Sequence, residues 1–113
     1  MKISIKIQDE NKDAILAEAM EAISRVSSGE TRWERDRIYG YHEAECAVSV
    51  ETVLPVFRAL IEKYPKLSIF AIDSEEIRED DSSAQWWRST KITTERRPDG
   101  MTDLKIDSGT YWA

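Results

Sequence analysis

The sequence contains very little cysteine, histidine, glycine and proline. Cys46 is the only cysteine and His42 the only histidine, so an intramolecular disulfide and the usual Cys/His zinc sites are excluded. The four glycines are scattered along the chain, and no Gly-rich phosphate-binding loop can be built from them. These absences remove the commonest sequence signatures of metal, nucleotide and nucleophilic chemistry.

His42 and Cys46 are the one pair of side chains that a Cys-His mechanism could use. The alternation from Ala44 to Val50 predicts a strand, in which residues four apart share a face but lie about 13 Å from each other. That distance exceeds hydrogen-bond reach, so we expect Cys46 to be a small core residue. The acidic residues lack the spacing of a calcium loop. We therefore predict no catalytic residues, no metal and no cofactor.

Long apolar runs are also missing. No stretch approaches the ~18 apolar residues that span a bilayer, and the first residues lack the apolar core of a secretory signal. Asp and Glu number 22 against 16 Lys and Arg, a formal net charge of −6, which disfavours binding to nucleic acids or membranes. An acidic surface favours a basic protein partner, and the lone cysteine suits a reducing cytoplasm.

Hydrophobic patterning predicts one domain over residues 1–113. Alternation over residues 3–7 predicts a half-buried strand, and apolar residues at helical spacing predict a helix from Lys12 to Val26. Residues 31–50 predict either a hairpin that turns at Tyr39-Gly40 or one long bent strand. The N-terminal half therefore supplies one helix and the first strands of a sheet.

A second helix should follow, with Thr52 as its N-cap, Pro55 in its first turn and Tyr64-Pro65 at its end. The stretch LSIFAID is apolar on both registers, as in a central strand. The acidic run after it is expected to form a loop or short helix. Ala84–Glu95 and the segment around Leu104 and Ile106 predict two strands joined by an RPDG turn. This order predicts an α+β two-layer sandwich, with a largely antiparallel sheet of about five strands and two helices on one face.

The adjacent tryptophans Trp86 and Trp87 must point to opposite faces if they lie in one strand. Trp86 shares its parity with Ile92, so we expect Trp86 in the core and Trp87 on the open face. A bulge or a slip of one residue would reverse or merge these roles. The open face would then be covered by a partner or by the chain's own Tyr111-Trp112 tail.

Part of the chain also carries a family resemblance. Phe57 and Leu60 lie on the expected helix, Tyr64-Pro65 ends it, Leu67–Ile72 forms a strand, and Glu75-Glu76 precede an aromatic strand. In these features the segment Phe57–Trp87 resembles the ferredoxin-like domain of Api92-like proteins, small proteins of phages and plasmids. The resemblance implies a ferredoxin-like variant of the α+β fold and a mobile-element origin, without an activity.

The leading functional hypothesis is a non-enzymatic protein–protein interaction module. It would be an inhibitor from a mobile element that acts on a basic or nucleic-acid-handling partner, such as a phage anti-defence (anti-CRISPR) or toxin-immunity protein. An exposed tryptophan is a favourable binding hot spot. The candidate partner-binding residues are Trp87, Trp33, Tyr41, Glu75, Glu76, Glu79, Asp80 and Asp81. The alternatives are a small-ligand-binding protein with an aromatic-lined pocket and a carboxylate-based enzyme.

Overall fold

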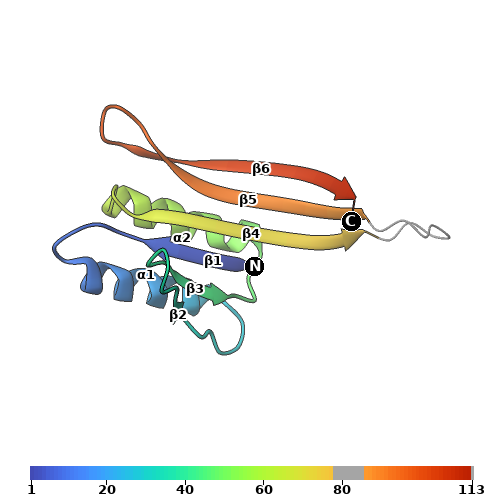
Figure 1. The fold of residues 1–113 in the computed structure, drawn as a ribbon, viewed down its shortest axis with the longest axis horizontal. Helices are drawn as coiled ribbons and strands as arrows, with labels where there is room; N and C mark the ends of the chain where they lie inside the picture. The colour runs from blue at the N-terminus through green and yellow to red at the C-terminus, as the bar shows by residue number, and fades with distance from the viewer. Residues whose placement is uncertain (78–85, 113) are drawn as a thin grey trace.

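The computed structural model describes the backbone of residues 1–77 and 86–112, and the side chains of residues 1–75 and 88–109. Its elements are β1 (Lys2–Lys6), α1 (Lys12–Val26), β2 (Glu34–Arg35), β3 (His42–Glu45), α2 (Val50–Lys63), β4 (Ser68–Ile77), β5 (Trp86–Arg96) and β6 (Thr102–Trp112). Within these residues the strands form one sheet in the order β2-β3-β1-β4-β5-β6, with every neighbouring pair antiparallel. Figure 1 shows both helices on the same side of the sheet. The α+β class is therefore confirmed.

The described sheet has six strands, not about five, because residues 34–45 form a hairpin and not one bent strand. The strand predicted to continue to Val50 ends at Glu45, and Val50 is the first residue of α2. The turn of the hairpin lies at Arg37–Tyr39, and Gly40 follows with a left-handed φ of 75°, a conformation that only glycine adopts without strain. The Asp36 backbone N–H donates to the Tyr41 carbonyl at 2.7 Å. Local turn chemistry thus decides between the two alternatives that the sequence left open.

Helix α1 has the predicted bounds and packs on the sheet through one apolar stripe. Its buried residues, Ile15, Leu16, Ala19 and Ile23, recur three and four positions apart. They join Ile3 and Ile5 of β1, Phe57 of α2 and Ile92 of β5 in a single hydrophobic core. Burying each large aliphatic side chain contributes about 1.5–3 kcal/mol, so this core holds the two layers together. Among the described residues, neither helix is long and apolar enough to span a lipid bilayer.

Helix α2 begins earlier than the sequence predicts. Its N-cap is Ser49 and not Thr52: the Ser49 hydroxyl accepts the Thr52 backbone N–H at 3.2 Å and lies 2.8 Å from the Thr52 hydroxyl. Pro55 consequently lies inside the helix, beyond the first turn, where the missing N–H removes one bond to the carbonyl four residues earlier. The helix ends at Tyr64, as expected.

Strands β4, β5 and β6 extend well beyond the end of β1, the strand that pairs with the other edge of β4. The pairing of β1 with β4 stops at Lys2↔Ile72, whereas β4 pairs with β5 as far as Ile77↔Trp86. Figure 1 shows the three strands running past the start of β1 and beyond both helices. We call this part, residues 73–77, 86–90 and 108–112, the three-stranded extension. Residues 73–77, expected as loop or short helix, are strand because β5 pairs with them along their whole length.

The two tryptophans lie in β5 with no bulge between them. Pairing with β4 runs without interruption from Phe70↔Thr93 to Ile77↔Trp86, so Trp86 and Ile92 occupy positions of the same parity. The expected burial of Trp86 and exposure of Trp87 lie outside the described side chains. The backbone of Tyr111 and Trp112 belongs to β6 and pairs with that of Trp87 and Trp86. The tail therefore continues the sheet edgewise and does not fold across its face.

Candidate functional site

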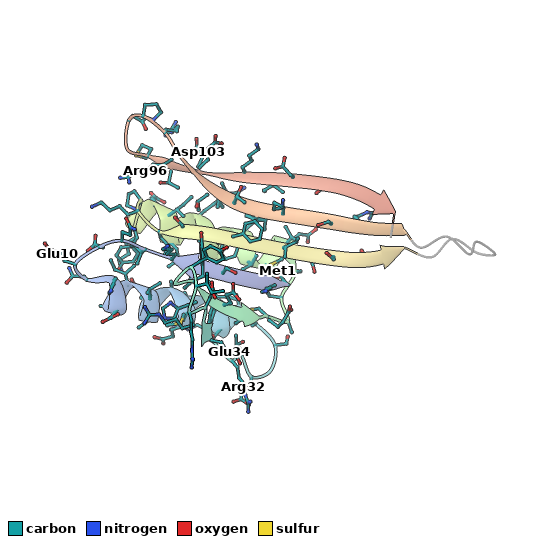
Figure 2. All side chains as sticks on the ribbon, in the orientation of Figure 1. Met1, Glu10, Arg32, Glu34, Arg96 and Asp103 are labelled. Carbon is teal, nitrogen blue, oxygen red and sulfur yellow. The ribbon has the colours of Figure 1, made fainter. Side chains whose placement is uncertain are left out.

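The sheet has one face covered by helices and one face free of them. Alternate residues of β1, β4 and β5, namely Ile3, Ile5, Ile69, Ala71 and Ile92, are at most 2% exposed beneath the helices. The intervening positions, including Lys2, Ser4, Phe70, Ile72 and Lys91, lie on the other face. Figure 2 shows the described side chains on all of these strands. We call it the open face and build the candidate site there.

A cavity of about 350 Å³ lies on the open face between β1, β3, β4 and the β2–β3 turn. Its apolar walls come from Tyr39, Tyr41, Phe70 and Ile72, and Ser4 of β1 also lines it. Phe70 is 38% exposed and lies directly opposite Ser4 in the β1–β4 ladder. Tyr39 and Tyr41, which precede β3, and Phe70 of β4 therefore lie around one hollow over β1. They give the open face a concave, aromatic-lined site.

The β2–β3 turn holds one wall of this cavity in place. The Asp36 carboxylate accepts the backbone N–H groups of Ile38 at 3.2 Å and Tyr39 at 3.0 Å, an arrangement that fixes the turn. Ile38 and Tyr39 at its tip are 81% and 67% exposed. Two large apolar side chains are thus presented to solvent next to the cavity, where burial against another molecule would be favourable.

The polar rim of the cavity carries two carboxylates and one ammonium group, that of Lys2, and is partly paired. Glu43 of β3 accepts the Ser4 hydroxyl at 3.4 Å and lies 3.7 Å from the Lys2 ammonium. Asp36 completes the rim from the turn. On the neighbouring part of the open face, the Lys91 ammonium lies 5.8 Å from the centre of the Phe70 ring, within the range of a cation–π contact. The site therefore combines aromatic walls with two carboxylates.

The structure separates two aromatic residues that the sequence grouped as partner-binding. Tyr41 is half-buried and lines the open-face cavity. Trp33 is half-buried against the core, and its indole N–H donates to the Ser24 hydroxyl of α1 at 3.0 Å. Trp33 therefore lies on the helix side of the molecule and helps to attach the β2 segment to α1. Only Tyr41 belongs to the candidate site.

The other candidates belong to the three-stranded extension or lie beyond it. Glu75 is exposed and pairs across the ladder with Arg88, and Glu76 pairs with Trp87. The side chains of Glu76 and Trp87 fall outside the described set, as do residues Glu79, Asp80 and Asp81 altogether. Glu75 and Tyr41 are thus placed on different parts of the sheet, and the described residues form no single surface from all eight candidates.

Cys46 and His42, the two residues considered for a Cys-His mechanism, lie in surroundings that differ from those of a reactive site. Cys46 is 2% exposed, and burial raises the pKa of its thiol. Its Sγ contacts the Ala44 carbonyl at 3.8 Å. The His42 Nδ1 atom is buried without a hydrogen-bond partner among the described residues. No group of three or more His, Cys, Asp or Glu side chains suited to a metal ion occurs in the part of the chain that the structure describes.

Sequence reasoning missed Phe70 and Ile72 as site residues. The signal was present, because the stretch LSIFAID is apolar on both registers and only one register, Leu67, Ile69 and Ala71, is buried beneath the helices. It was read as a fully covered central strand. Since no helix covers the second face, the extra apolar residues are available for binding. Comparison of the chain with protein-family models, curated proteins and solved structures finds no match.

Proposed function

We propose that this chain is a non-enzymatic interaction module that binds a basic protein partner through the open face. The observation that carries the proposal is the aromatic cavity beside the exposed tip formed by Ile38 and Tyr39. Interface cores are enriched in aromatic residues that fill or form pockets. The acidic rim, Asp36 and Glu43, and the net charge of −6 would attract a partner with a positive patch.

We further infer that the fold is a ferredoxin-like variant. The order β1-α1-β2-β3-α2-β4 with neighbours β2-β3-β1-β4 matches the split βαβ arrangement of that class. Strands β5 and β6 then extend the sheet by a hairpin. Together with the resemblance of Phe57–Trp87 to Api92-like proteins, this topology supports an inhibitor from a mobile element, of the anti-defence or toxin-immunity type, acting in the cytoplasm.

A photo-crosslinking amino acid placed at residue 39 tests the binding surface. In lysate from the native host, we expect it to capture one basic protein in equimolar amount. The same probe at Ala17, an exposed position on α1, is the control and should capture nothing comparable. Substituting Phe70→Ser should reduce capture from residue 39, and raising the salt concentration should slow complex formation. Equal capture from both positions would contradict the proposal.

The runner-up is a small-ligand-binding protein that uses the same cavity. Its volume of about 350 Å³ lies within the range of ligand pockets, roughly 300–1,000 Å³. Native mass spectrometry of the purified protein distinguishes the two functions. A copurified small molecule that is lost on Phe70→Trp, which would fill the cavity, favours the ligand-binding function over the partner-binding one.

A further inference from the structure

A second hollow, distinct from the open-face cavity, lies at the opposite end of the sheet from the three-stranded extension. This groove has a volume of about 540 Å³ and lies where β1 and β5 end and where β4 and β6 begin. Three cationic side chains line it, Lys6, Lys66 and Arg96, and no carboxylate does. In a chain with 22 acidic residues against 16 basic ones, a groove with three positive charges and no negative one is unexpected.

These three cations are also free of ion pairs within the part of the chain that the structure describes. Some other basic residues have carboxylate partners: Lys63 lies 2.7 Å from Glu18, and Arg25 lies 2.9 Å from Glu21. Lys6 instead places its ammonium 5.4 Å from the centre of the Tyr41 ring. Like charges gathered in one hollow repel one another, and a bound anion would relieve that repulsion.

The ends of paired strands hold several of the residues that line the groove. Lys6 is the last residue of β1, Arg96 the last of β5, and Thr102 the first of β6. The Thr94 hydroxyl accepts the Ile69 backbone N–H at 3.1 Å, which fastens β4 to β5 beneath the groove. Tyr41 and Ser68 also line the groove, and a hydroxyl group can donate to an oxygen ligand. Figure 2 shows Arg96 at this end of the sheet, close to the final turn.

We propose that this groove binds a compound bearing a di- or triphosphate group. An arginine fork and two lysine ammonium groups match an anion whose charges are spread over several oxygens. The volume exceeds that of a single small ion and leaves room for the organic part of the ligand. The site does not depend on partner binding at the open face, although Tyr41 lines both hollows.

Isothermal titration calorimetry with inorganic pyrophosphate tests this site. At an ionic strength of about 0.1 M, where the Debye length is about 10 Å, we expect saturable binding at one site. Lys66→Gln and Arg96→Gln should each weaken it about tenfold, because each removes a charge-assisted hydrogen bond. Both residues are exposed, and circular dichroism will confirm that the variants fold.

Lys105→Gln and Arg58→Gln are the matched controls, since both residues are exposed and line a different groove. They should weaken binding by less than about twofold, because neither residue lines the proposed groove and a charge that does not contact the ligand is largely screened at this ionic strength. The proposal is overturned if pyrophosphate shows no saturable binding, or if the controls lose as much affinity as the groove variants. It is also overturned if a single-stranded oligonucleotide competes more strongly than pyrophosphate, because the groove would then serve nucleic acid.

Discussion

The indole N–H of Trp33 donates a hydrogen bond of 3.0 Å to the Ser24 hydroxyl, and this contact ties the segment before β2 to the last turns of α1. This hydrogen bond gives Trp33 a structural role, although the sequence predicted that Trp33 binds a partner. Because Trp33 is half-buried against the core, its contribution comes both from the hydrogen bond and from apolar burial.

Removing this hydrogen bond should lower the free energy of unfolding. Ser24→Ala is expected to cost about 1 kcal/mol, the typical net value of one hydrogen bond, and Trp33→Phe should cost more, because it also removes apolar surface packed against the core. The double variant should cost less than the sum of the two, because both remove the same bond. Urea unfolding followed by circular dichroism measures the three values. Fully additive losses would show that the bond contributes nothing to stability.

Ile92 of β5 and Ile106 of β6 lie directly opposite each other in the ladder, but Ile92 is buried and Ile106 is exposed. Ile92 is 0% exposed beneath the helices, whereas Ile106 on the edge strand is 43% exposed. Ile92→Ala should therefore destabilise the protein by about 2–5 kcal/mol, and Ile106→Ala by less than about 1 kcal/mol. Thermal unfolding of the two variants compares them directly. Similar losses would mean that the helical layer reaches β6 at this point.

Glu18 should make stability depend on pH in the acid range. The Lys63 ammonium, followed by the Tyr64 hydroxyl, lowers the pKa of the Glu18 carboxyl below its ordinary value of 4.5. A group whose pKa is lower in the folded state stabilises the fold above its ordinary pKa and loses that effect as the pH falls through the folded value. The Glu18→Gln variant should therefore be less stable at pH 7 and lose less stability than the parent protein as the pH falls below 4.5.

Urea midpoints at neutral and acid pH test this expectation. Glu21→Gln is the matched control, because Glu21 lies on the same helix and pairs with Arg25 within α1. An equal flattening of the pH profile by both substitutions would show that the effect is not specific to the contact between α1 and α2.

Cys46 should be chemically silent in the folded protein. It is 2% exposed and its thiol pKa is raised by burial, and the thiolate is the reactive form. A disulfide reagent at pH 8 should label Cys46 only after denaturant is added. Rapid labelling of the native protein would contradict this and would point to local opening of the end of β3.

Local patterns predicted the elements that rest on local chemistry. The apolar stripe of α1 was sufficient for its bounds, and the alternation over residues 3–7 located β1 to within one residue at each end. The predicted N-cap of α2, Thr52, was wrong, because Ser49 three residues earlier is an equally good capping residue and the backbone geometry selects it. Residues 73–77 carry acidic side chains that disfavour strands, and pairing with β5 overrides that preference.

The two hollows could not be predicted, because their residues come together only through topology. The groove is lined by Lys6, Lys66 and Arg96, which are far apart in the sequence. The antiparallel order of β1, β4 and β5 places all three at the same end of the sheet. The open-face cavity likewise depends on which face the helices leave uncovered. Hydrophobic periodicity predicts which face of a strand is apolar, but it does not predict what covers that face.

The central position of β1 has a consequence for how the chain folds during synthesis. Its partners are residues 42–45 of β3 and 68–72 of β4, so its apolar alternation has no strand to pair with until those segments exist. At about 5–20 residues per second, that delay is on the order of ten seconds. Strands β5 and β6, joined by a short turn, can pair within microseconds of emerging. The middle of the chain therefore decides when β1 can join a sheet, and the final hairpin then completes the core by adding Ile92.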